Sequence, residues 1–281
     1  MNDMYTRFRV YWMPNGGISM SYSVDTSFIL IEARYNNDNR EKIKSEMKLS
    51  GKDSVDLLHI SSWSENRCNP EELEILLQEL KPLDIEIPAY EPNNENGLQC
   101  RRIIRDYHQH SMYADLFEVG HNSIVRLSEL EDFDYLDPIF TPINKYSEES
   151  DNAIVKLFRS GKFSILNLSD CVHDNDIISQ INDVNLKDSI DVLVMNQFDQ
   201  VDNSEFLQHL IDCCSPRCIV SLSDWRILIR KDNLLSKQGI AVVVSEQKDV
   251  IIKYGLSKFQ QALNTDDVSV VKNVEYNDHN I

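Results

Sequence analysis

The chain has 281 residues, of which 42% are hydrophobic and 26% charged, so it can bury a sizeable core and is not disordered as a whole. Its 46 acidic and 28 basic side chains give a formal net charge of −18, which repels nucleic acid and anionic membranes. No window approaches the roughly 18 uninterrupted apolar residues of a membrane span. Residues 1–10 contain no apolar signal-peptide core, so we expect a cytoplasmic protein that contacts neither membrane nor nucleic acid directly.

Strand-like runs dominate the first part of the chain. Short apolar and β-branched runs at 8–13 and 28–31 are separated by a Pro-Asn-Gly-Gly turn at 14–17. The charged residues 40–52 have weak helical periodicity, which indicates a surface segment. The compact apolar run at 55–60 predicts a buried strand.

A helix start signal follows the next polar loop. Asn69 can cap the helix, Pro70 suits its first position, and Glu72 stands where a capping-box acid belongs. Four leucines then repeat at helical spacing: Leu73, Leu76, Leu77 and Leu80. With a short strand at 85–88, this stretch predicts a strand–loop–helix–strand unit.

The later elements follow from shorter patterns. A helix at 97–110 precedes expected strands at 124–127 and 139–141, and a hairpin has its arms at 153–158 and 163–168. The remaining expected elements are strands and helices at 189–195, 204–213, 218–222, 240–244, 249–254 and 257–263. The strands 240–244 and 249–254 are expected to form a hairpin with each other. Since no linker or repeat divides the chain, one domain is expected.

Four landmarks in this order carry a resemblance to a known family. They are ILIEA at 29–33, DLLHI at 56–60, a hairpin ending in ILNLSD at 165–170, and DVLVMNQ at 191–197. The sequence resembles the metallo-β-lactamase-fold hydrolases, particularly the branch resembling the soluble domain of bacterial competence (DNA-uptake) channel proteins. The resemblance implies an α/β (α+β) chain folded as a four-layer αββα sandwich, with a metal site at one edge of the paired sheets. It assigns residues 1–265 to the domain and 266–281 to a polar, acidic tail.

The places that carry metal in this family are degenerate here. In relatives, a loop with an HxHxDH pattern and a later histidine pair hold one or two zinc ions, because zinc prefers imidazole, thiolate and carboxylate ligands. The matching places hold hydroxyl, amide and guanidinium groups: Ser62, Ser64, Asn66, Arg67, Asn196 and Gln197. Only Asp170, at the place of the bridging carboxylate, survives. A guanidinium cannot ligate a divalent cation and repels it, so we expect no zinc, no other cofactor and no catalytic residue.

The resulting hypothesis is a pseudoenzyme that acts through protein contacts in a multiprotein system. Its expected partner is an active paralogue or another component, in a homo- or hetero-oligomer, with a role in phage defence or foreign-DNA handling suggested by analogy alone. One alternative is a phosphodiesterase or nuclease with a remodelled divalent-metal site at Asp170, His173 and Asp199.

A third hypothesis is an anion- or nucleotide-binding module whose remnant pocket is lined by Ser62, Ser64, Arg67 and Asn196. Arg67 favours it, because a guanidinium offers a forked donor for phosphate. The competing interpretation of Arg67 is a salt bridge to Asp170 that fills the place of the metal. For His59, inside the buried strand, the expected role is a core histidine hydrogen-bonded to backbone.

Overall fold

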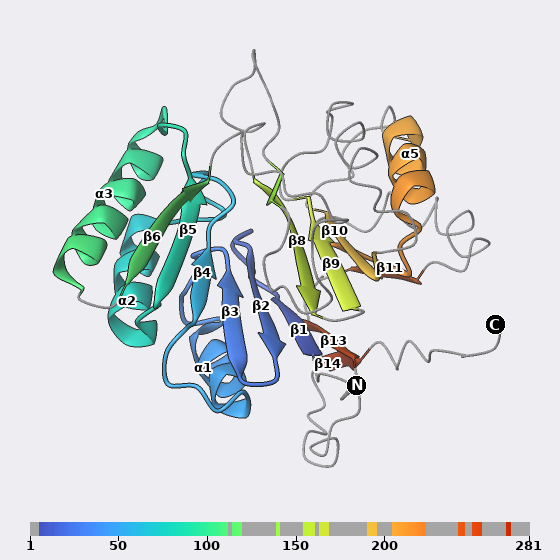
Figure 1. Cartoon of the computed structure of the whole chain (residues 1–281), viewed down its shortest axis with the longest axis horizontal. Helices are drawn as coiled ribbons and strands as arrows, with labels where there is room; N and C mark the ends of the chain where they lie inside the picture. The colour runs from blue at the N-terminus through green and yellow to red at the C-terminus, as the bar shows by residue number, and fades with distance from the viewer. Residues whose placement is uncertain are drawn as a thin grey trace.

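Two β-sheets lie face to face with helices on their outer sides (Figure 1). The computed structural model describes residues 6–111, 114–119, 139–140, 154–160, 163–168, 190–195, 204–222, 241–244, 249–254 and 268–270. Within these residues, α1 (Arg40–Leu49), α2 (Pro70–Leu80) and α3 (Glu95–His110) cover the first sheet, and α5 (Ser204–Cys214) lies beside the second. This arrangement is the expected αββα order of layers.

The first sheet has eight strands in the order β14-β13-β1-β2-β3-β4-β5-β6. Their bounds are β1 Thr6–Tyr11, β2 Ser19–Val24, β3 Ser27–Ile31, β4 Leu57–His59, β5 Asp84–Pro88, β6 Asp115–Val119, β13 Asp249–Tyr254 and β14 Val268–Val270. Strands β1 to β3 are antiparallel, and β3 to β6 are parallel with α1, α2 and α3 as their crossovers. The carboxyl ends of β3, β4 and β5 therefore meet at one edge of the sheet.

The second sheet has six strands in the order β12-β11-β10-β9-β8-β7. Their bounds are β7 Ile139–Phe140, β8 Val155–Ser160, β9 Phe163–Asn167, β10 Val192–Met195, β11 Cys218–Ser221 and β12 Ala241–Val244. The antiparallel pair β8–β9 confirms the hairpin expected from its sequence pattern. Strands β9 to β12 are parallel, so their carboxyl ends also share one edge.

Alternation along the strands divides the core into two layers. On β1, Phe8 and Val10 face the second sheet, and the cluster between the sheets continues with Ile165 and Val194. Arg7 and Arg9 occupy the other face of β1, toward α1. A second cluster, which includes the α2 leucines, fills the space between the first sheet and its helices.

Local signals placed most of the elements correctly. The Asn69 side chain accepts hydrogen bonds from the backbone of Glu71 and Glu72 at 3.1 and 3.3 Å, which confirms the predicted cap of α2. The Glu72 carboxylate binds Arg34, Asn36 and the Tyr35 amide rather than acting as a capping-box acid. Among the described helices, none is long and apolar enough to cross a membrane.

Three expectations about strands were wrong or incomplete. Strand β2 was not predicted, so the 14–17 turn joins β1 to β2 rather than to β3. The hairpin of 240–244 with 249–254 does not form, because β12 pairs with β11 and β13 pairs with β1 in the other sheet. Strand β6 was also missed. The expected elements at 124–127 and 257–263 lie outside the described residues, and β14 falls within the segment assigned to the tail.

Candidate functional site

A buried carboxylate organises the loop that follows β4. Glu32 directly follows β3 and has φ 67°, a left-handed conformation that costs a non-glycine residue about 1–2 kcal/mol. Its backbone N–H donates to the His59 carbonyl at 2.7 Å. Its carboxylate accepts the Ser61 amide at 3.0 Å, the Ser61 hydroxyl at 2.5 Å and Arg67 Nη1 at 2.7 Å. Since Glu32 and Arg67 are both 0% exposed, this ion pair anchors the loop from inside the protein.

Three predicted site residues meet in the same loop. The hydroxyls of Ser62 and Ser64 lie 2.8 Å apart, and the Ser64 hydroxyl donates to Asn66 Oδ1 at 2.6 Å. Because Ser64 has one hydroxyl proton and gives it to Asn66, Ser62 is the donor in the first contact. Ser62 is buried, whereas Ser64 and Asn66 are half-buried. The three side chains are therefore linked by hydrogen bonds along the loop.

A second buried cluster joins the two sheets beside this loop. His59 Nδ1 lies 2.9 Å from Glu86 Oε2, and Lys156 Nζ donates to the same oxygen at 2.6 Å. His59 and Glu86 lie on neighbouring strands β4 and β5, and Lys156 comes from β8 of the other sheet. The expectation that His59 bonds to backbone was wrong, because its Nδ1 contacts the Glu86 carboxylate on the neighbouring strand rather than a peptide group.

Opposing effects determine the pKa of Glu86. Burial alone would raise it, but the hydrogen bond from His59 and the charge of Lys156 outweigh burial and lower the pKa to about 2. Phe158 lies edge-on to the imidazole at 5.6 Å between ring centres. His59 Nε2 is buried and has no hydrogen-bond partner in the described part of the chain. The network thus holds an ionised carboxylate between two nitrogen groups.

The comparisons with known proteins agree with this architecture. No family model and no curated protein matches the sequence. Among solved structures, a metallo hydrolase of the hyperthermophilic archaeon Ignicoccus hospitalis is similar, with 12% identity, a TM-score of 0.52, and 88% of this chain and 99% of that chain covered. A diphosphatase from the PhnP family has 12% identity and a TM-score of 0.50, covering 90% of this chain and 98% of that chain. The chain has the metallo-β-lactamase fold.

In a metallo-β-lactamase fold, the loop after β4 is the place where the resemblance implies metal ligands. The described residues do not fit a zinc ion there: the loop offers two hydroxyls and an amide that bind one another, next to a fully buried guanidinium. Nowhere in the described ranges do three or more His, Cys, Asp or Glu side chains form a group that could hold a metal.

The other predicted site residues cannot be placed. Asp170, Asn196 and Gln197, and the alternative ligands His173 and Asp199, lie outside the described residues. A contact between Arg67 and Asp170 is therefore untested. In the structure, Arg67 forms an ion pair with Glu32.

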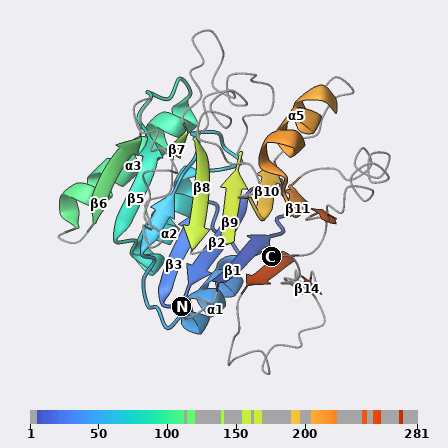
Figure 2. The same ribbon diagram turned by 45° about the vertical axis from the view of Figure 1, so that its right-hand side comes forward.

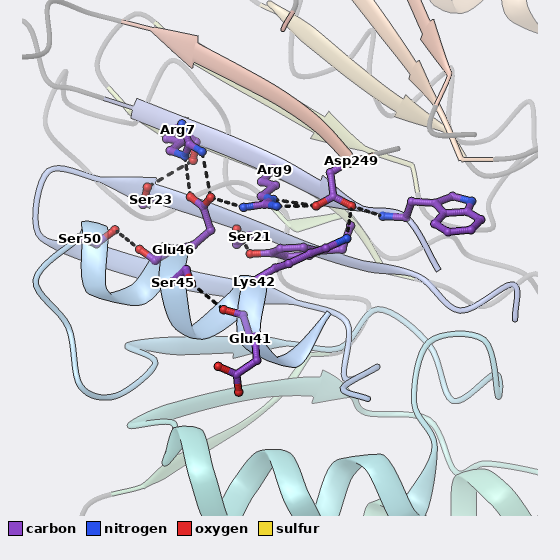
Figure 3. A network of polar contacts seen from close by, with 12 residues as sticks. Arg7, Arg9, Ser21, Ser23, Glu41, Lys42, Ser45, Glu46, Ser50 and Asp249 are labelled. Carbon is purple, nitrogen blue, oxygen red and sulfur yellow. Dashed lines mark hydrogen bonds and ion pairs between the residues drawn. The ribbon is translucent and has the colours of Figure 1, made fainter. Parts of the chain in front are cut away.

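Sequence reasoning missed a charged network between α1 and the first sheet (Figure 3). Glu46 accepts hydrogen bonds from Arg7 at 2.5 and 2.9 Å and from Arg9 at 2.5 Å. Asp249 on β13 accepts from Arg9 and Lys42, and from the Trp12 backbone amide. Burial would raise the pKa of Glu46, but the hydrogen bond and charge of Arg7 outweigh it, so the pKa is lowered. The signal available in the sequence was the pair Arg7 and Arg9, which alternate along β1, together with the acidic Glu46 in the segment that forms α1.

This network predicts a measurable role for Asp249. The variant Asp249→Ala is expected to lower the free energy of unfolding by about 1–3 kcal/mol, because it leaves Arg9 and the Trp12 amide short of an acceptor in a buried setting. Urea unfolding followed by circular dichroism measures the effect. Glu41→Ala is the matched control, since that α1 side chain is 83% exposed and should change stability by less than about 0.5 kcal/mol. Equal losses in both variants would contradict the assigned network.

Proposed function

We propose that the chain is a pseudoenzyme: a metallo-β-lactamase fold without a hydrolytic metal site, acting through protein contacts. The observation that carries the proposal is the buried Arg67–Glu32 ion pair, next to the mutually bonded Ser62, Ser64 and Asn66. These groups occupy the loop where the family resemblance implies histidine and aspartate ligands. Zinc sites in proteins are built from cysteine, histidine and carboxylate side chains, and the hydroxyl and amide groups at these places are not of that kind.

The chemistry of hydrolysis supports the same proposal. A catalytic zinc lowers the pKa of its bound water to about 7, and it needs three protein ligands of nitrogen, sulfur or carboxylate type to do so. In this loop, such ligands are replaced by hydroxyl and amide groups. The buried carboxylate next to this loop is that of Glu32, after β3, and it is committed to Arg67 and Ser61.

Two other functions receive less support from the geometry. An anion-binding module would use the forked donors of Arg67, yet this side chain is 0% exposed and paired with Glu32. A divalent-metal phosphodiesterase would rest on Asp170, His173 and Asp199, which lie outside the described residues. The PhnP-family structure is that of a diphosphatase, but at 12% identity it supports only a shared fold.

The proposed setting is a multiprotein system in the cytoplasm. The partner would be an active paralogue or another component of a system for foreign-DNA handling or phage defence, by analogy with the competence branch that the landmarks resemble. The net charge of −18 favours a basic protein partner over direct contact with DNA.

Metal analysis of the purified full-length protein tests the proposal. After incubation with zinc or manganese and desalting, we expect far less than one equivalent of metal and no phosphodiesterase activity. Asp170→Ala should behave like the unmodified protein in both measurements. Near-stoichiometric metal that disappears together with phosphodiesterase activity in Asp170→Ala would overturn the proposal. A thermal-shift series with nucleotides is expected to show no stabilisation, and a clear shift would favour the binding module instead.

A further inference from the structure

Strand β6 forms one edge of the eight-stranded sheet. Within the part of the chain that the structure describes, β6 pairs with β5 and with no strand on its other side. Figure 1 shows it at the outer margin of the first sheet, beside α3. An edge strand presents unpaired backbone groups, which makes it a template for pairing with another strand.

The recorded backbone bonds show which groups face outward. The Asp115 N–H donates to the Leu83 carbonyl at 2.8 Å, and the Val119 carbonyl accepts from the Ala89 N–H at 2.9 Å. In a parallel pair, every second residue directs its N–H and C=O to the same neighbour. Asp115, Phe117 and Val119 are therefore turned toward β5. The backbone groups of the two residues between them, 116 and 118, are turned away from the sheet.

The side chains of β6 suit a partner at this edge. Phe117 is 49% exposed, one of the largest apolar side chains at the surface. Glu118 is held on the α3 side by Arg105 at 2.9 Å and by Arg101 at 3.2 Å. The outward-facing backbone of the strand is thus flanked by a fixed carboxylate on one face and an exposed aromatic ring on the other.

We propose that β6 pairs antiparallel with β6 of a second copy of this chain, around a two-fold axis at Phe117. In this register Leu116 lies opposite the partner's Glu118 on one side of the axis. Glu118 lies opposite the partner's Leu116 on the other side. Both residues direct their backbone groups outward, so each of the two pairs exchanges two hydrogen bonds. The two Phe117 side chains then meet at the non-hydrogen-bonded position, where opposite Cα atoms are about 4.5 Å apart.

The charges of the strand are compatible with self-pairing in this register. Asp115 stands opposite the partner's Val119, and Glu118 opposite the partner's Leu116, so no two carboxylates face each other directly. A register shifted by one residue in either direction would lose the match between outward-facing backbone groups. A shift by two residues that centres the pair on Glu118 would place two carboxylates opposite each other, and the register centred on Phe117 avoids this repulsion.

This surface adds an oligomeric state to the proposed function without depending on it, because the dimer forms whether or not the loop after β4 holds a metal. The paired segment is short, which places the interface at the small end of the protein–protein range. We therefore expect a weak dimer whose population rises with protein concentration. Metal analysis and association measurements can consequently fail independently of each other.

Sedimentation equilibrium of the full chain tests the dimer. The unmodified protein is expected to dimerise with rising concentration, and Phe117→Lys should weaken dimerisation at least tenfold by placing two cations at the axis. Leu98→Lys is the matched control: it replaces another exposed apolar residue, 40% exposed on α3, and should leave the dimer unchanged. A protein that stays monomeric at high concentration, or a dimer unaffected by Phe117→Lys, would overturn the proposal.

A crosslinking experiment tests the register with conservative variants. Phe117→Cys is expected to give a reducible covalent dimer under a mild oxidant, because two cysteines at a non-hydrogen-bonded antiparallel pair are close enough for a disulfide. Glu118→Cys should not crosslink to itself, since its opposite residue is the partner's Leu116. The unmodified protein under the same oxidant controls for native cysteines. Equal crosslinking of both variants would contradict this register.

Discussion

Replacing Arg67 by methionine is expected to lower the free energy of unfolding by about 3–5 kcal/mol, because it leaves a buried carboxylate without its counter-charge. Glu32 and Arg67 are both 0% exposed, so water cannot take the place of the guanidinium. The loss extends beyond the ion pair, because Glu32 also fixes the loop through the Ser61 amide and hydroxyl. Urea unfolding at neutral pH, followed by circular dichroism, measures the change.

Two companion variants separate this effect from a general response to losing a cation. Lys52→Met breaks the Lys52–Asp56 ion pair, whose side chains are 28% and 24% exposed, and should cost less than about 1 kcal/mol. The double variant Arg67→Met with Glu32→Gln removes both buried charges and should recover part of the loss. If Arg67→Met proved no more harmful than Lys52→Met, the ion pair would not be what holds the loop.

The elements that the sequence predicted well are those whose signals are local. The α2 cap and leucine face lie within twelve residues, and the β8–β9 hairpin needs only two runs and a turn. Strand β2 carries a regular alternation of serine with apolar residues, which a search for period two would have found. Strand β6 is short and two of its five residues are charged, so its position depends on pairing with β5 rather than on its own pattern.

The site could be predicted only in part. The resemblance identified Ser62, Ser64 and Asn66, which do meet in one loop. It did not identify Glu32 as the partner of Arg67, although Glu32, the acidic residue of the first landmark, was the available signal. One partner of Arg9, Asp249, is 240 residues away in the sequence, so no local pattern can indicate it. Contacts across sheets depend on register, which becomes known only once the strands are assembled.

The stability of this protein is expected to depend on pH through Glu86. Its pKa falls from an ordinary 4.5 to about 2 in the folded protein, because His59 and Lys156 stabilise the ionised form. A carboxyl whose folded pKa is depressed stabilises the fold above its unfolded pKa, and this stabilisation is lost as the pH falls from about 4.5 toward 2. At about 1.4 kcal/mol for each unit of pKa, the contribution at neutral pH is about 3 kcal/mol.

Glu86→Gln should therefore be less stable than the unmodified protein by about 3 kcal/mol at pH 7, and this difference should shrink as the pH falls below about 4.5 and disappear near pH 2. Urea unfolding at several pH values gives both curves. Asp84→Asn, two residues away on β5, is a control with the opposite expected effect. Burial and the charges of Asp115, Glu86 and Asp56 raise the pKa of Asp84. The ionised Asp84 carboxylate therefore destabilises the fold, and replacing it by an amide should stabilise the protein at pH 7. Two variants on one strand that change stability in opposite directions cannot be explained by a general loss of negative charge. A Glu86→Gln curve parallel to that of the unmodified protein would mean that the Glu86 carboxylate is not held by His59 and Lys156.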